Sequence, residues 1–210
     1  GGYIPKTPKA KAIFRNSKMT ENNWEALEKM LNKMTGTSIG NALYNKIVET
    51  LSSKTIILEF VENSNSLFDP SLSTIKLRTD ASSGVLFHEM FHLLQSYTEQ
   101  ETWNGSALNR DVEAHLAQQI YINSLPESER IWWREKSKKD ARWNATRELT
   151  GYIDENGKLR PEFNEVRLQK LLENRVIKSF RRVGYTANNY PWLNSRIGTS
   201  NFNTIRILSQ

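Results

Sequence analysis

Residues 88–92 read His88-Glu89-Met90-Phe91-His92, which is the pattern H-E-x-x-H. The flanking sequence has the apolar spacing of a helix, and residues four apart lie on one helical face. Two imidazoles at this spacing can bind one Zn²⁺, with the glutamate between them as general base toward a water on the metal. The chain has three histidines, and two of them are in this pentapeptide. The alternative is a chance match to the pattern on a core helix.

The predicted motif helix turns its two histidines away from its apolar side. At 100° per residue, one broad arc contains the apolar side chains Leu86, Phe87, Met90, Phe91, Leu93, Leu94 and Tyr97. His88 and His92 lie on the opposite side, near Gly84, Val85 and Gln95. A core histidine pair would fall within the apolar arc. We therefore expect both imidazoles to face a cleft.

A catalytic zinc usually has three protein ligands, so a third ligand must come from elsewhere. The helix predicted at residues 109–123 offers Asp111, Glu113 and His115. Residues two apart on a helix point about 200° apart, so at most one of Glu113 and His115 can face the metal. Glu113 lies on the apolar stripe, where an unpaired carboxylate is costly, and His115 lies on the polar face. We predict Glu113 as the third ligand, with a buried salt bridge as the alternative.

The segments before the motif predict a small sheet. Residues 55–61 are apolar and β-branched, as in an inner strand, and residues 64–71 are typical of a loop. Residues 74–79 alternate apolar and polar, and Lys76 and Arg78 are typical of a protected edge strand. We expect an α+β fold, mostly helical, with a small sheet whose edge strand precedes the HExxH helix.

The domain organisation expected from the sequence is a basic arm at residues 1–19 and a single domain over residues 20–210. The domain divides into a core at 55–123, a helical portion at 124–184 and an irregular tail at 185–210, in which only 204–208 look like a strand. The chain has no cysteine, which excludes disulfides and thiolate chemistry. No run of eighteen apolar residues is present, so no membrane span is expected.

The pentapeptide followed by Glu113 resembles the zincin metallopeptidases, specifically the branch with a glutamate as third ligand, the gluzincins. Twenty residues separate His92 from Glu113, close to the short spacing of that branch. The resemblance covers residues 55–123. It implies a zincin-like fold, Zn²⁺ held by His88, His92 and Glu113, and a substrate backbone held along the strand at 74–79.

The resemblance also bears on two further points. The metzincin branch needs a glycine and a third histidine soon after His92, and residues 93–98 contain neither. Gluzincins often stabilise the oxyanion with a distal histidine or tyrosine, and Tyr185 and Tyr190 are the candidates for this catalytic role. Simple packing or surface tyrosines are the alternative for both.

The function predicted from these residues is a zinc-dependent endopeptidase, a hydrolase that acts on a peptide or protein substrate with Glu89 as general base. We expect a secreted or extracytoplasmic monomer. The alternatives are an inactive zincin-like binding module, a zinc hydrolase of a non-peptide amide, and a peptidase toxin delivered to a target cell. An intact Glu89 argues against the inactive module, because a site kept only for structure needs no base.

The net charge of +6 is concentrated in one part of the chain. Residues 126–182 contain 15 Lys/Arg and 10 Asp/Glu. Such a surface is either simply solvated or attracts an acidic protein, a nucleic acid or an anionic membrane. The sequence carries no signature of a nucleic-acid-binding fold, so no nucleic-acid partner is expected.

Overall fold

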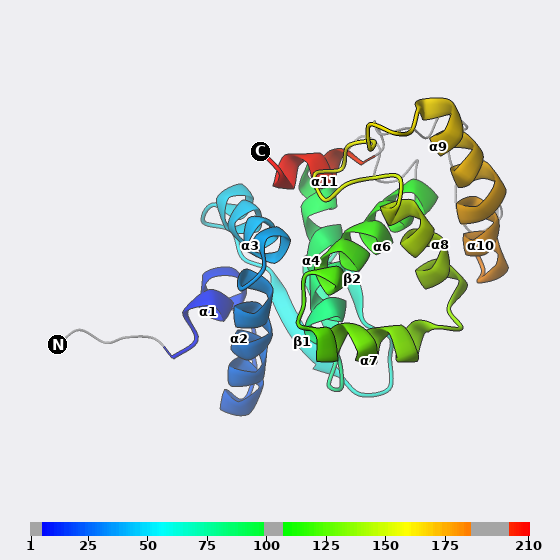
Figure 1. The fold of residues 1–210 in the computed structure, drawn as a ribbon. Coiled ribbons are helices and arrows are strands. Elements are labelled where there is room, and N and C mark those ends of the chain that lie inside the picture. Colours follow the sequence, from blue (N-terminus) through cyan, green and yellow to red (C-terminus); the bar gives the residue numbers. More distant parts are fainter. Residues whose placement is uncertain (1–5, 99–106, 186–201) are drawn as a thin grey trace. The chain divides into compact units, whose positions relative to one another are not determined.

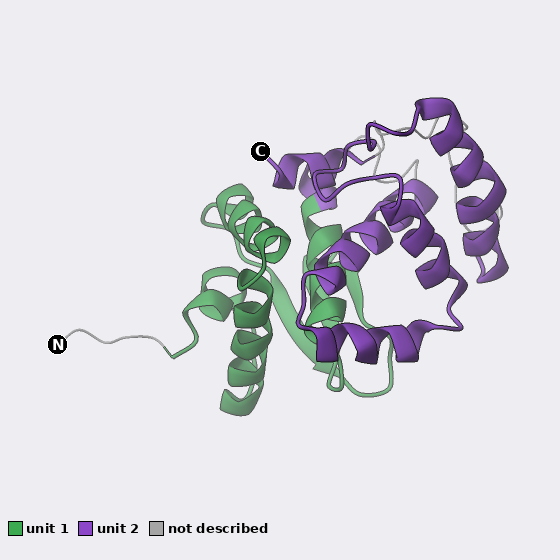
Figure 2. Ribbon diagram, in the orientation of Figure 1, with its two compact units in different colours: residues 1–94 green, residues 95–210 purple. Residues whose placement is uncertain are grey.

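The computed structural model describes residues 6–98, 107–185 and 202–210. The chain divides into two compact units, residues 1–94 and residues 95–210 (Figure 2). The boundary falls inside a single helix, α4 (Ser83–Thr98). The single-domain organisation stays a prediction.

The first unit begins with three helices, α1 (Pro8–Phe14), α2 (Glu21–Thr35) and α3 (Ser38–Leu51) (Figure 1). The hydroxyls of Thr20 and Thr37 accept backbone hydrogen bonds at the starts of α2 and α3, as N-cap residues do. The start of α1 is held by Glu28, whose carboxylate accepts hydrogen bonds from two backbone N–H groups, those of Lys9 at 3.0 Å and Ala10 at 2.7 Å.

The prediction of an arm at residues 1–19 is wrong where α1 forms. Ala10, Ile13 and Phe14 are fully buried, and α1 packs against α2 and α3. Their spacing of three and four residues gives even this short helix an apolar face. Residues 8–14 are therefore part of the first unit.

The sheet has three strands, β1 (Ile57–Val61), β2 (Leu67–Asp69) and β3 (Thr74–Arg78), in the order β1-β3-β2. β3 is parallel to β1 and antiparallel to β2. The end of α1 and the chain after it lie along the start and the outer edge of β1. The N–H of Ile56, just before β1, bonds to Ile13 O at 3.0 Å, and the N–H of Leu58 bonds to Ser17 Oγ at 2.8 Å.

The sheet corrects two predictions about strand position. The predicted edge strand at 74–79 is the central strand β3, and the predicted inner strand at 55–61 contains the outer strand β1. The cause is β2, which forms inside the predicted loop at 64–71 and pairs with β3. Alternation in β3 therefore reports its two faces, with Ile75 and Leu77 fully buried, and says nothing about its strand neighbours.

The second unit is helical. It contains α6 (Ala107–Asn123), α7 (Glu127–Ser137), α8 (Ala141–Thr150), α9 (Glu165–Leu171), the π-helical turn η1 (Leu172–Val176), α10 (Ile177–Arg182) and α11 (Asn203–Leu208). α6 packs against α8, and a buried hydrogen bond of 3.2 Å joins Thr146 Oγ1 to Gln119 Oε1. α9, η1 and α10 follow one another without a break (Figure 1).

The C-terminal helix α11 corrects the prediction of an irregular tail with a strand-like segment at 204–208. Ile205 is buried and packs on Gly157, where an added Cβ would lie 2.9 Å from Ile205 Cγ2. Gly157 has a φ of 74°, in the left-handed region that favours glycine. A helix of this length is not stable alone, so its form depends on these tertiary contacts.

The overall class is α+β, mostly helical with a small sheet, as the sequence predicts. Among the helices that the structure describes, none combines the length and the apolar character needed to cross a membrane.

Candidate metal centre

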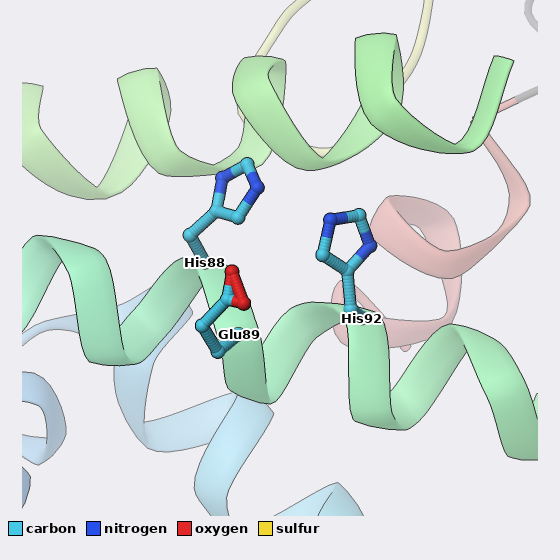
Figure 3. A group of neighbouring side chains, drawn as sticks. All are labelled: His88, Glu89 and His92. Atoms are coloured by element: carbon cyan, nitrogen blue, oxygen red, sulfur yellow. The ribbon is translucent and has the colours of Figure 1, made fainter. Parts of the chain in front are cut away.

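Helix α4 places three polar side chains, His88, Glu89 and His92, on one side (Figure 3). The helix starts after Ser82, whose carbonyl oxygen accepts hydrogen bonds from Val85 and Leu86 N–H. The predicted apolar arc of this helix is buried except at its end, where Tyr97 is half-buried. The other members, Leu86, Phe87, Met90, Phe91, Leu93 and Leu94, are each at most 1% exposed. Packing of this arc sets the rotation of the helix and therefore the direction of the histidines.

The two imidazoles lie one helical turn apart and face each other edge to face. Their ring centroids are 4.7 Å apart, and the ring planes are 85° apart. The potential ligand atoms of His88, Glu89 and His92 all lie within 4.8 Å of one another. Both histidines are half-buried and Glu89 is only 6% exposed. The group has the nitrogen and oxygen donors needed to hold a metal ion.

Glu113 is fully buried on α6, as the apolar stripe of that helix predicts. Its Oε1 accepts a hydrogen bond from Gln95 Nε2 at 2.8 Å. Its Oε2 accepts hydrogen bonds from the backbone N–H of Thr204 at 3.0 Å and of Ile205 at 3.3 Å. These two N–H groups belong to the first turn of α11, where a negative charge is favourable. The carboxylate therefore anchors the C-terminal helix, a role that the sequence alone did not reveal.

Gln95 is a buried polar residue of α4 whose structural role the sequence analysis missed. It follows His92 by three positions, on the same face of α4, and is fully buried. Its amide nitrogen donates both to Glu113 Oε1 and to Arg110 O, the latter at 3.1 Å. The signal was present in the pattern, because a polar amide on the histidine face of a buried helix needs hydrogen-bond partners.

The remaining predicted residues lie in the second unit or outside the described residues. His115 is half-buried, and its ring is edge-on to the ring of Phe180, with the ring centroids 5.4 Å apart. The ring of Tyr185 also packs on that of Phe180, with the ring centroids 5.3 Å apart. The Tyr185 hydroxyl accepts a hydrogen bond from Arg142. Tyr190 lies outside the described residues. The catalytic role predicted for the two tyrosines stays a prediction.

Arg142 links Tyr185 to an acidic group on the same unit. The guanidinium donates to Asp140 through Nε at 3.2 Å and Nη2 at 3.0 Å. Burial acts to raise the pKa of Asp140, but the hydrogen bond and charge of Arg142 outweigh it and hold that pKa below its ordinary value. Tyr185 is therefore adjacent to a charged pair that stays ionised.

No family model matches the chain, and no curated protein or solved structure is significantly similar to it. The function of the chain is therefore inferred from its side chains, chiefly from the donor group on α4.

Proposed function

We propose that this protein is a zinc-dependent endopeptidase of the zincin type. The observation that carries the proposal is the donor group His88, Glu89 and His92, whose potential ligand atoms lie within 4.8 Å of one another on one helix. Two neutral imidazoles one turn apart on a helix suit a Zn²⁺ ion, and the intervening glutamate suits a general base. In this proposal His88 and His92 are two of the three protein ligands.

Glu113 is the third ligand in this proposal. Its carboxylate is held by Gln95, which lies on the histidine face of α4 three positions after His92. Carboxylates that bind metal ions are themselves commonly hydrogen-bonded, so these hydrogen bonds are compatible with a ligand role. Gln95 then acts as a positioning residue that fixes the orientation of this ligand, as the outer partners of metal ligands commonly do.

The chemistry of the proposal divides between the metal and the chain. Bound zinc supplies a positive charge that polarises a water molecule and the scissile carbonyl. Glu89 accepts a proton from the attacking water and then donates it to the amine nitrogen that leaves. Glu89 is only 6% exposed, so bulk water has little access to it.

The position of β3 excludes the predicted role of residues 74–79 as an edge strand that holds the substrate backbone. β3 has a strand on each side, so its backbone is already paired and it is not the edge that holds a peptide. The inactive binding module and the zinc hydrolase of a non-peptide amide both remain as alternatives to the peptidase. Both predict zinc binding without cleavage of peptides in the experiment below, and the peptidase predicts both zinc binding and cleavage.

The test combines metal analysis with a digest of a broad peptide library. We expect about one Zn²⁺ per chain, the stoichiometry of a mononuclear site, and cleavage of library peptides that stops in the Glu89→Gln variant. Zinc without cleavage of peptides would favour the binding module or the non-peptide hydrolase. Failure to take up zinc on titration of the purified chain would refute the metal site itself.

A further inference from the structure

Two adjacent hollows lie in the second unit, between α8 and the continuous helical segment α9-η1-α10. Their volumes are about 620 Å³ and about 340 Å³. Both are lined by Glu148, Asn174 and Arg175, so they join into one groove. α8 packs against η1 and α10, which gives the groove a floor of packed helices.

The groove is strongly basic. Its cationic lining side chains, all exposed, are Arg167, Lys170, Arg175, Lys178 and Arg182. Glu148 is its one acidic lining residue among the described part of the chain. The carboxylate of Glu173, in the same helical segment, is not part of the lining and accepts a hydrogen bond from Gln169 at 2.6 Å. A concave surface with one sign of charge concentrates the field and attracts ligands of the opposite sign.

The π-helical turn η1 contributes to this clustering. A π-helical turn holds more residues than an α-helical turn, and such segments occur often at functional sites. Within η1, the consecutive residues Asn174 and Arg175 both line both hollows. Arg175 Nη1 lies 2.7 Å from Glu148 Oε1, which holds the guanidinium at the centre of the groove. These side chains are 66% and 39% exposed, so the ion pair adds little to stability and leaves the arginine accessible.

We propose that this groove binds an extended acidic segment of a partner protein. At about 1.5 Å per residue the helical segment Glu165–Arg182 is roughly 27 Å long, which matches about eight residues of extended peptide. Aspartate and glutamate side chains on such a peptide pair with the arginines and lysines along the groove. The planar guanidinium of arginine suits carboxylates, because it can donate two parallel hydrogen bonds to one carboxylate.

The lining favours an acidic peptide over a nucleic acid. Glu148 places a carboxylate in the middle of the groove, where it repels a continuous row of phosphates but can accept a hydrogen bond from a peptide N–H. The Asn174 amide can likewise donate to and accept from a peptide backbone. Proteins that bind single-stranded nucleic acid stack bases on aromatic rings. Among the described lining residues one is aromatic, Tyr152, and the ring of Phe163 already stacks on it with the ring centroids 4.2 Å apart.

The test measures binding of a fluorescent peptide of about ten residues, rich in Asp and Glu, by anisotropy. A second peptide has Asn and Gln in place of the acids, and a third probe is a single-stranded oligonucleotide of similar length. The proteins carry Glu89→Gln so that peptide cleavage does not interfere. The groove variant is Arg167→Glu with Lys178→Glu. The control variant is Arg130→Glu with Lys139→Glu, which makes the same change in net charge at exposed residues outside the groove.

We expect the acidic peptide to bind, the neutral peptide not to bind, and the affinity to fall as ionic strength rises. The groove variant should bind about tenfold or more weakly, and the control variant nearly as tightly as the parent. The milder pair Arg167→Gln and Lys178→Gln should give a smaller loss in the same direction if the reversal disturbs folding. Absence of binding by the parent, equal losses in groove and control variants, or tighter binding of the oligonucleotide would each overturn the proposal.

Discussion

Gln95 Nε2 donates a hydrogen bond of 2.8 Å to Glu113 Oε1, and both side chains are fully buried. The amide is on the face of α4 that carries His88 and His92. The carboxylate in turn accepts hydrogen bonds from the first turn of α11. Glu113 therefore has a structural role that is independent of any metal, and experiments on the proposed site must separate the two roles.

Replacing Gln95 tests whether this residue positions a metal ligand. Gln95→Leu keeps most of the volume but removes the donor to Glu113, so we expect zinc affinity to fall by about 10-fold to 100-fold, as for other outer partners of metal ligands. Loss of the buried hydrogen bonds should also lower the free energy of unfolding by about 1–3 kcal/mol. Zinc affinity is measured by competition with a chromophoric chelator, and stability by urea unfolding of the metal-free chain.

The matched control for that substitution is Gln119→Leu. Gln119 is also buried, and its amide oxygen accepts a hydrogen bond from Thr146 between α6 and α8. This variant should lose stability by a similar amount and keep its zinc affinity. If both leucine variants lose zinc equally, Gln95 acts only through general stability.

Alanine substitutions at Glu113 and His115 distinguish between the two candidate zinc ligands on α6. Glu113→Ala should greatly weaken zinc binding, and His115→Ala should leave it nearly unchanged, because the two residues point to opposite sides of the helix. Glu113→Ala should also increase hydrogen exchange at the N–H groups of Thr204 and Ile205, which lose their acceptor. Isothermal titration with zinc measures the first effect, and hydrogen exchange measures the second. Loss of zinc in His115→Ala alone would make His115 the ligand.

Glu89→Gln tests the general base. The amide has nearly the same shape as the carboxylate but accepts a proton poorly, so peptide cleavage should fall by about 10²-fold to 10⁴-fold. Zinc content and thermal unfolding should stay close to those of the parent. The measurement is the rate of cleavage of the best library peptide at saturating zinc. A variant that retains full activity would remove Glu89 from the mechanism.

Tyr44 makes the stability of the first unit depend on pH in the alkaline range. Burial, together with the nearby charge of Glu28, raises the pKa of Tyr44 to about 12. Its hydroxyl donates to Lys9 O at 3.0 Å, and Glu28 caps the start of the same helix, α1. The folded-state pKa lies above the ordinary value near 10. The protonated Tyr44 hydroxyl therefore contributes fully to the free energy of unfolding below pH ~10, and this stability is lost as the pH rises toward ~12.

The substitution that tests this dependence is Tyr44→Phe. The variant should be less stable at neutral pH by about 1 kcal/mol, through loss of one hydrogen bond. Its free energy of unfolding should then fall less steeply than that of the parent between pH 10 and 12. Urea unfolding across this pH range measures both effects. Identical slopes in the two proteins would show that Tyr44 does not cause the alkaline loss.

The features that the sequence determined by itself are those with local causes. The helix at His88–His92 follows from apolar residues at helical spacing, and their burial confirms the predicted arc. The same periodicity placed Glu113 on a buried stripe and the two imidazoles on the opposite side of their helix from the apolar arc. A helical period relates residues within one turn or two, so it can be read without knowledge of the rest of the chain.

The tertiary structure decided the features that depend on which segments pair with one another. β3 is central because residues 67–69 pair with it, and strand alternation carries no information about which strands lie beside it. Residues 203–208 form a helix because Glu113, some ninety positions earlier, accepts the hydrogen bonds of its first turn. Gln95 likewise has its role only through Glu113 and Arg110. In each case the deciding hydrogen bonds join groups that no periodic pattern of the sequence pairs, and only the folded chain brings them within bonding distance.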